Sequence, residues 1–253
     1  MYALITGASS GIGKELAKKY ANDNYDLILV ARRIELLEEL KKELNVNVII
    51  KNFDLSIEEN AYKLYEETKN LDIEVLVNNA GVGDYALFEE ASLDKQIFMT
   101  KLNDITPIIL TKLYLNNFIK KNSGHIINIC SVASFYPGPL MNTYYATKSY
   151  LYNFSLGLRE ELKRNKRNIY VSVICPGPTK TEFEKNANFE FGFKPQSAIK
   201  VVDYSYKKLK RHKVIIIPSF AHRVVKFLSR FVSDKMKAKI IYKAQRTKKW
   251  KRY

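Results

Sequence analysis

The sequence predicts an α/β protein, a single domain built on a doubly wound, mostly parallel sheet of seven strands. Short apolar runs alternate with amphipathic, helix-length segments along most of the chain, as in a parallel sheet with helical crossovers. The runs are nearly continuous in apolar residues, which is typical of strands buried on both faces. The chain has 253 residues, 46% of them hydrophobic, enough for one large core. The expected strands are 2–6, 26–31, 46–50, 74–78, 125–130, 169–175 and 214–217.

A glycine-rich turn, Gly7-Ala-Ser-Ser-Gly11-Ile-Gly13, separates the first strand from a helix that runs to about Asn22. Strand, turn and helix in this order open a dinucleotide-binding βαβ unit. Gly7 permits the tight turn, Gly11 lets the backbone approach a pyrophosphate, and Gly13 lets helix and strand pack closely. We therefore expect a dinucleotide at the N-terminus of this helix.

Two arginines, Arg32 and Arg33, follow Ala31 at the end of the second strand. NAD-binding proteins carry an acidic residue at this place for the ribose 2′-hydroxyl. Two guanidinium groups match a 2′-phosphate better, so the sequence favours NADP(H) over NAD(H). The alternative for Arg33 is that it only opens the next helix on its solvated face.

The alternation of strands and helices continues through the middle of the chain. A helix is expected over about 34–44, and after the third strand a helix that Ser56 caps and that ends near Lys69. A long helical stretch begins at Leu93 and contains Pro107. Because proline lacks a backbone N–H donor, it predicts a kink or a break there.

Strand five ends at Ser131, and Tyr144 and Lys148 follow inside the next helix, four residues apart. That spacing places a phenol and an ammonium one turn apart on one helical face. A cation beside the phenol would lower its pKa from about 10 toward the working range. Ser131 could then share a substrate oxygen with Tyr144, which predicts proton transfer at a carbonyl or alcohol oxygen. The alternative is a surface Tyr-Lys pair without a chemical role.

The periodicity fails over residues 181–195, the lid segment, in which Phe189, Phe191 and Phe193 alternate with other residues. A loop of this length inside a compact domain is more often functional than filler. We expect a lid over a hydrophobic substrate, and the alternative is a short strand that buries one face. A helix over about 196–210 and the last strand complete the sheet.

The net charge of +16 is concentrated at the C-terminal end of the chain. Residues 207–253 contain 17 Lys and Arg against one acidic residue, whereas the remainder holds 25 of each sign.

From Val224 to Ile240, apolar residues recur at helical spacing with Lys and Arg between them. A basic amphipathic helix is typical of contact with an anionic membrane. The alternative is a helix pair that packs on the body or on a second subunit, with its basic face in solvent. Nucleic acid is a distant third partner, because no recognition module accompanies the charge.

The two cysteines, Cys130 and Cys175, each end an apolar run. We expect buried thiols, because free cysteine is among the most buried residue types. They form neither a disulfide framework nor a metal-ligand spacing, so no metal is expected.

The first strand begins at Tyr2 and no apolar run could span a bilayer. We expect a cytoplasmic protein, with peripheral membrane contact through the basic tail left open.

Over residues 2–218 the chain resembles the short-chain dehydrogenase/reductase family, because five motifs occur in the family's order and spacing. They are T-G-A-S-S-G-I-G at 6–13, N-N-A-G at 78–81, Asn103, Ser131 with Tyr144-x-x-x-Lys148, and P-G-P-T-K-T at 176–181. More loosely, the F-Y-P-G-P segment before Tyr144 and the basic tail look like bacterial general oxidoreductases of this family.

The resemblance implies a Rossmann-fold domain with a catalytic tetrad. Tyr144 would be the general acid/base, Ser131 would orient the carbonyl, Lys148 would lower the tyrosine pKa and hold the ribose, and Asn103 would hold a water in the proton relay. Arg32 is placed like the basic residue of NADP-preferring members, and Asp54 like the contact to the adenine ring. The implied cofactor site consists of Gly7, Ser9, Ser10, Gly11, Ile12, Gly13, Arg32, Arg33, Asp54, Leu55, Asn79, Ala80, Gly81, Tyr144, Lys148, Pro176, Gly177, Thr179 and Thr181.

The sequence thus predicts an NADP(H)-dependent oxidoreductase domain over residues 1–218 and a basic helical extension over residues 219–253. The expected reaction is hydride transfer that reduces a carbonyl to an alcohol, or the reverse, on an apolar or lipid-like ketone. A promiscuous reductase of small ketones or sugars is the alternative enzyme, and a non-catalytic cofactor-binding scaffold that acts through its basic tail is the alternative from another class. The family resemblance further implies a homodimer or homotetramer that pairs through the helices around Leu110 and Phe154.

Overall fold

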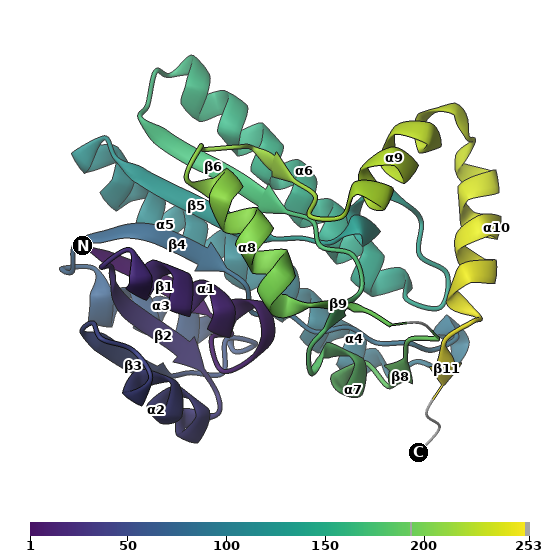
Figure 1. Cartoon of the computed structure of the whole chain (residues 1–253), viewed down its shortest axis with the longest axis horizontal. Helices are drawn as coiled ribbons and strands as arrows, with labels where there is room; N and C mark the ends of the chain where they lie inside the picture. Colours follow the sequence, from purple (N-terminus) through teal and green to yellow (C-terminus); the bar gives the residue numbers. More distant parts are fainter. Residues whose placement is uncertain (193, 251–253) are drawn as a thin grey trace.

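Seven strands form one sheet in the order β10-β6-β5-β4-β1-β2-β3 (Figure 1). The computed structural model describes residues 1–192 and 194–250. Every pairing within this sheet is parallel, which confirms the predicted doubly wound α/β fold. The strands are β1 Tyr2–Thr6, β2 Asp26–Ala31, β3 Val48–Asn52, β4 Ile73–Asn78, β5 Gly124–Ile129, β6 Ile169–Ile174 and β10 Ile215–Ile216.

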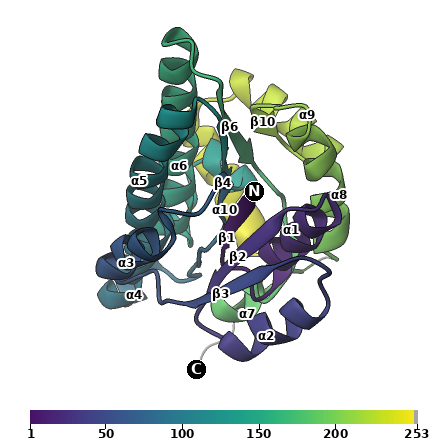
Figure 2. The ribbon, with the colours of Figure 1, turned by 90° about the vertical axis from the view of Figure 1, so that its left-hand side faces the viewer.

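Helices cover both faces of the sheet. Figure 2 shows the central sheet between two helical layers, with α3, α5 and α6 on one side and α1, α2 and α8 on the other. The helices of the body are α1 Gly11–Asn22, α2 Ile34–Lys42, α3 Glu58–Thr68, α4 Leu93–Thr100, α5 Thr106–Lys121, α6 Asn142–Arg164, α7 Phe183–Asn186 and α8 Ala198–Leu209.

The two largest hydrophobic cores, one on each face of the sheet, hold these layers together. Successive side chains of a strand point to opposite faces. In β1, Ala3 and Ile5 therefore pack in the core beneath α1 and α8, whereas Leu4 packs in the core beneath α3 and α5. The second core contains the fully buried rings of Tyr114 and Phe118. Because both faces of the strands are buried, their sequences are apolar almost throughout.

The third strand and the start of the third helix differ from the sequence prediction. β3 begins at Val48, two residues later than expected, because its register with β2 pairs Val48 with Leu27 and leaves Asn47 to bond Asp26. Ser56 does not cap α3, whose N-cap is Ile57 without a side-chain bond. The Ser56 hydroxyl instead donates to Asp54 Oδ1 at 2.7 Å.

The helical stretch around Pro107 is interrupted, although the irregular turn lies just before the proline. A π-helical turn, Lys101–Ile105, separates α4 from α5. Pro107 occupies the first turn of α5, where a backbone N–H has no intrahelical partner. The π-helical turn includes Asn103 and buries its side chain toward the carboxyl end of β4.

The lid segment forms short elements instead of an open loop. β7 (Thr179–Lys180) pairs with β9 (Gln196–Ser197), and β8 (Phe189–Glu190) pairs antiparallel with the C-terminal β11 (Lys249–Trp250). Phe193, the third phenylalanine of the predicted alternation, lies outside the described residues. The lid segment is therefore tied to the far end of the chain.

The C-terminal extension consists of α9 (Phe220–Leu228), a 3-10 turn and α10 (Asp234–Gln245) and returns to the body at its end (Figure 1). Lys226 of α9 lies 4.0 Å from the centre of the Phe135 ring. His222 packs so closely on Gly177 that a Cβ there would lie 2.4 Å from the imidazole. None of the described helices combines the length and the apolar character needed to cross a membrane.

Candidate active site

A cavity of about 410 Å³ lies at the carboxyl ends of the parallel strands. The chain passes from β1 to β2 and β3 on one side and then to β4 and β5 on the other, so the winding direction reverses between β1 and β4. Ligands of open α/β sheets bind in the crevice that such a reversal creates. The walls come from the ends of β1, β2, β4, β5 and β6 and from the lid segment.

The glycine-rich turn forms the floor of one end of the cavity. Gly7 and Gly11 have positive φ values of 64° and 57°, a conformation that glycine adopts without strain. At Gly13 a Cβ would lie 2.4 Å from the Gly7 carbonyl oxygen, so only glycine lets helix and turn approach this closely. The Ser10 side chain does not cap α1, which leaves the first N–H groups of the helix open to an anion.

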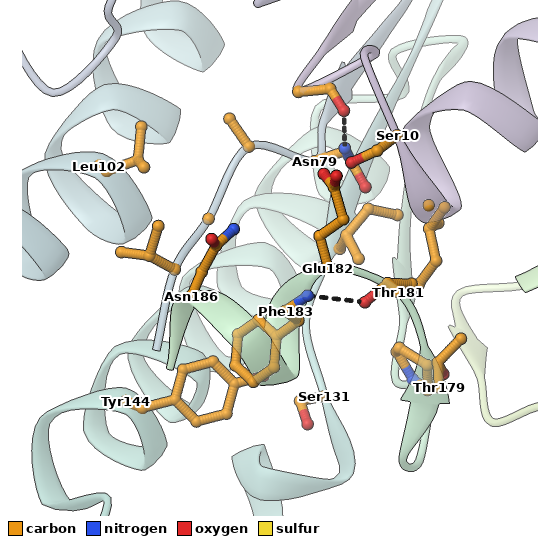
Figure 3. Close-up of a pocket in the computed structure, with 18 of the residues that line it drawn as sticks. Ser10, Asn79, Leu102, Ser131, Tyr144, Thr179, Thr181, Glu182, Phe183 and Asn186 are labelled. Atoms are coloured by element: carbon orange, nitrogen blue, oxygen red, sulfur yellow. Dashed lines mark hydrogen bonds between the residues drawn. The ribbon is translucent and has the colours of Figure 1, made fainter. Parts of the chain in front are cut away.

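Asn79 ties the segment after β4 to the glycine-rich turn. Its Nδ2 donates to the carbonyl oxygens of Thr6 at 2.8 Å and Gly7 at 3.0 Å, and Figure 3 places it beside Ser10. The Thr6 hydroxyl accepts from the backbone N–H groups of Asn79 and Ala80, both at 3.0 Å. The two loops that would hold a dinucleotide are thus fixed to each other.

The two arginines after β2 both line the cavity but are held differently. Arg33 makes a two-armed ion pair with Glu182 of the lid segment, at 2.5 and 3.0 Å, and also donates to Ser9 and Ser10. Arg32 is mostly exposed and lies 3.6 Å from Asp54. The Arg33 guanidinium thus helps to lower the pKa of the Glu182 carboxyl, mainly through their hydrogen bond.

Ser131, Tyr144 and Lys148 come together at the other end of the cavity (Figure 3). Ser131 follows β5 and caps the 3-10 turn after it, its hydroxyl accepting from the Ala133 N–H at 3.1 Å. Tyr144 and Lys148 lie one turn apart on α6, as their spacing predicts. The Lys148 ammonium donates to the Ile129 carbonyl oxygen at 2.9 Å, which holds it under the cavity.

The expectation that Lys148 lowers the pKa of Tyr144 does not hold in this structure. Burial raises the pKa of Tyr144 to about 12, and the hydrogen bond with Ser131 is the opposing influence. The Lys148 ammonium lies 5.9 Å from the centre of the phenol ring and is directed at a backbone carbonyl instead. Burial also lowers the pKa of Lys148. The phenol is therefore protonated at neutral pH.

Asn103 lies behind the cavity wall. Its side-chain oxygen accepts from the Val82 N–H and its Nδ2 donates to the Val82 carbonyl, both at 2.9 Å. Nδ2 also donates to the Thr147 hydroxyl at 3.1 Å. A Cβ on Gly81 would lie 3.1 Å from Asn103 Oδ1 and 3.3 Å from Lys148 Nζ. Asn103 thus joins the segment after β4 to α6.

Nearly all of the site residues predicted from the motifs line one cavity. Gly13 and Asn103 are the two exceptions, and each contacts residues that do line it. Three features of the cavity fit a phosphorylated dinucleotide. They are the glycine-rich turn at residues 7–13 (the glycine cradle), the open N-terminus of α1 and the arginines at the end of β2. Among the described residues, no cluster of His, Cys, Asp and Glu could hold a metal ion.

The end of the cavity that contains Tyr144, where a substrate would lie (the substrate end), is aromatic. Phe183 of α7 packs against the Tyr144 ring, with centroids 5.1 Å apart, and Figure 3 shows it above Ser131. Phe189 and Phe191 of the lid segment continue this wall, with centroids 5.0 Å apart. Tyr145 of α6 completes it. The alternative prediction, a short strand that buries one face, is confirmed for β8, which buries Phe189 and exposes Glu190. A lid over a substrate stays a prediction.

Several lining residues were not predicted from the sequence. Met141, Glu182 and Phe183 flank predicted motifs, and proximity to a motif was the only signal for them. Lys248 lies more than 50 residues beyond the lid segment and had no local signal. The pairing of β11 with β8 and the hydrogen bond from Gln245 to Tyr145 bring it to the cavity.

Comparison with known proteins agrees with this geometry. The family model described as "short chain dehydrogenase" matches residues 1–190. The NADP-dependent 3-hydroxy acid dehydrogenase YdfG of Escherichia coli K12 is 36% identical over 182 residues, 70% of this chain and 72% of YdfG. Human dehydrogenase/reductase SDR family member 7 is 35% identical over 198 residues, 74% of this chain and 58% of the human protein.

Two solved structures share the fold over most of the chain. A short-chain dehydrogenase from Sphingobium yanoikuyae in complex with NADPH has a TM-score of 0.82 and 29% identity, with 91% of this chain and 93% of that chain covered. The bulky-bulky ketone specific alcohol dehydrogenase from Comamonas testosteroni has a TM-score of 0.78 and 28% identity, with 91% of both chains covered. The chain belongs to the short-chain dehydrogenase family.

Proposed function

We propose that this family member is an NADP(H)-dependent oxidoreductase that interconverts a ketone and a secondary alcohol. The observation that carries the proposal is the convergence of Ser131, Tyr144 and Lys148 on the cavity whose other end is the glycine cradle. A proton donor and a dinucleotide site in one cavity are what carbonyl reduction requires. A non-catalytic scaffold would need neither the phenol nor the serine in the same cavity as the dinucleotide site.

NADP(H) is the favoured cofactor. Arg32 and Arg33 supply two guanidinium groups at the end of β2, where a 2′-phosphate would lie. The naming of YdfG as NADP-dependent and the NADPH complex of the Sphingobium enzyme support the same preference. Asn79, Gly81 and the start of α1 would hold the rest of the dinucleotide, which supplies the hydride when bound.

Tyr144 supplies the proton, and Ser131 positions the carbonyl oxygen of the substrate. Tyr144 is protonated at neutral pH, as a proton donor for reduction must be, because burial raises its pKa to about 12. The Ser131 hydroxyl, fixed by the Ala133 N–H, shares the substrate oxygen with the phenol. Lys148, held by the Ile129 carbonyl oxygen at 2.9 Å, lines the cavity and would hold the ribose of the bound cofactor.

We propose further that the substrate carbonyl sits on an apolar body. Phe183, Phe189 and Phe191 form the wall next to Tyr144. Burying an apolar group against such a wall contributes about 25 cal/mol per Å² of area removed from water. The bulky-bulky ketone named for the Comamonas enzyme agrees with this choice. A reductase of small ketones or sugars would leave the aromatic wall without a partner.

Replacement of Tyr144 by Phe tests the reaction. Removal of the phenolic oxygen takes away the proton donor, and we expect NADPH oxidation with an apolar ketone panel to fall by about 100-fold or more. NADPH affinity, measured by fluorescence, should stay within a few-fold. Tyr62→Phe on the exposed face of α3 is the matched control and should retain full activity. Wild-type protein that leaves every ketone of the panel unreduced would instead favour the scaffold.

We also propose two contacts of the whole chain. Subunits of a homodimer or homotetramer pair through α5 and α6, where the exposed Tyr150 ring stacks on Phe154 and supports such a face.

The extension touches an anionic membrane through α9, which leaves Phe227 and Leu228 exposed beside arginines. Peripheral contact of this kind suits a cytoplasmic enzyme with an apolar substrate. A solution mass measurement decides the oligomer size.

A further inference from the structure

We propose that Lys248, from the C-terminal end of the chain, forms an anion subsite at the substrate end of the cavity. The ligand is a carboxylate on the substrate, so the ketone is an oxo acid with an apolar body. This inference rests on the proposed function, because it names the class of ketone that the same site accepts. It adds a residue that lies outside the part of the chain matched by the family model, residues 1–190.

The chain around Lys248 is fixed to the cavity wall. The buried Gln245 donates from side-chain Nε2 to the Tyr145 hydroxyl at 2.6 Å, and its backbone carbonyl oxygen accepts from the Tyr85 hydroxyl at 3.0 Å. Four residues after Gln245, at Lys249, β11 begins and pairs with β8 of the lid segment. Lys248 lies between these two attachments and lines the cavity. Its position is therefore built by long-range contacts on both sides.

The Lys248 ammonium sits among groups that bind it only weakly. Its Nζ lies 4.0 Å from the centre of the Phe189 ring, 5.5 Å from that of Phe191 and 5.6 Å from that of Tyr85. Its hydrogen-bond acceptor is the Met141 sulfur at 3.2 Å, a weak acceptor. An ammonium has three donors, so it retains capacity for a stronger partner.

No carboxylate in the described part of the chain forms an ion pair with Lys248. Glu184 acts on it only at longer range and accepts a hydrogen bond from the Phe191 N–H at 3.0 Å. Burial lowers the pKa of Lys248 to about 7. A cation that is partly removed from water and left without a counter-ion is costly. A bound carboxylate would offset that cost.

Lys248 lies apart from the positively charged residues of the expected cofactor site. Arg32 and Arg33 lie beside the glycine cradle, and Lys148 is directed at the Ile129 carbonyl. Lys248 lies among the lid phenylalanines instead. An apolar wall with one cation fits a ligand with an apolar body and one acidic group.

A paired substrate series tests the subsite on the full-length protein. Methyl-ketone carboxylic acids of increasing chain length would each be compared with their methyl esters, with NADPH oxidation as the readout. We expect wild type to prefer at least one acid, and Lys248→Met to lose about 10-fold or more in kcat/KM for that acid while the ester is unchanged. Lys248→Arg should restore part of the preference. Lys243→Met, on an exposed part of α10, is the matched control.

The pH dependence gives a second signature. Below about pH 7 Lys248 is an ammonium, and above it the free lysine is neutral. The kcat/KM for the acid should therefore fall as the pH rises above 7, and the ester should not show this fall. Equal losses for acid and ester in Lys248→Met would assign the lysine a structural role and overturn the proposal. Weaker NADPH binding in that variant would assign it to the cofactor and overturn it too.

A binding experiment separates this proposal from the proposed function. Calorimetric titration with octanoate, and with octanol as its uncharged partner, needs no turnover. We expect octanoate to bind wild type more tightly than octanol and to lose that advantage in Lys248→Met. Equal binding of the two by wild type would refute the anion subsite even if ketones are reduced. Octanoate binding without reduction of any ketone would leave the subsite standing and refute the proposed function.

Discussion

At the scale of single residues, the site contains buried titratable groups, and burial disfavours the charged form of each. Tyr144 is kept as a neutral phenol, and Lys148 is held by a backbone carbonyl at 2.9 Å. Beside them lies Asp104, a buried acid next to the predicted Asn103. Burial raises the pKa of Asp104 to about 7, with Lys148 as the opposing influence. Its Oδ1 has no hydrogen-bond partner among the described residues.

Replacement of Asp104 by Asn should stabilise the protein in a pH-dependent way. The folded state favours the protonated acid, so the stability it contributes is complete below about pH 4 and is lost as the pH rises toward 7. The amide does not titrate. The free energy of unfolding of the variant, relative to wild type, should rise by up to about 1.4 kcal/mol per pH unit over that window and then level off. Urea unfolding at several pH values measures it, and a difference independent of pH would contradict the burial of an unpaired carboxyl.

The cofactor preference also depends on single residues, and replacing the arginines should act in the opposite direction to replacing Glu182. Arg32→Ala and Arg33→Ala should each weaken NADPH more than NADH, because NADPH carries the additional phosphate. Glu182→Gln should strengthen NADPH by a few-fold, because Glu182 now competes for Arg33 at 2.5 Å. Fluorescence titration with both cofactors measures the three variants. Equal changes for NADPH and NADH in the arginine variants would refute the 2′-phosphate assignment.

At the scale of elements, the features that could be predicted are those that depend only on the local sequence pattern. Strands β1 and β2 are apolar on both faces, and the glycine-rich turn has steric demands that only glycine meets, as at Gly13. The spacing of Tyr144 and Lys148 needs only a helix. These features depend on neighbours in sequence, so the fold and the placement of the motifs could be predicted.

The lid segment and the C-terminal extension could be predicted only in part, because their structure depends on contacts between distant residues. β8 consists of two residues and is paired by β11, some 60 residues later. Lys248 reaches the cavity only through that pairing and the Gln245 contact with Tyr145. The prediction that Lys148 lowers the pKa of Tyr144 was wrong for a related reason. The direction of the Lys148 ammonium is set by the Ile129 carbonyl of another element, which the four-residue spacing does not encode.

At the scale of the whole molecule, charge and apolar exposure meet on the extension. Residues 1–206 hold equal numbers of acidic and basic residues, and the whole net charge of +16 lies in residues 207–253. On α9 and the turn after it, Phe227 and Phe231 are 56% and 79% exposed. Arg223 lies over the Phe220 ring and Arg230 over the Phe227 ring, so positive charge surrounds the exposed rings. Exposed rings inside a basic surface are what an anionic bilayer binds.

Vesicle binding should therefore require both the rings and the basic charge. Full-length protein should sediment with phosphatidylserine vesicles and not with phosphatidylcholine vesicles, and added salt should release it, because each basic residue near the surface contributes about 1 kcal/mol. Phe227→Glu with Phe231→Glu should abolish binding and leave NADPH affinity unchanged, since neither ring lines the cavity. Phe88→Glu, at a 62% exposed ring far from the extension in the sequence, is the matched control. If wild-type protein ignores both vesicle types, the exposed rings of α9 face another subunit instead, and the same double variant should then lower the mass of the particle in solution.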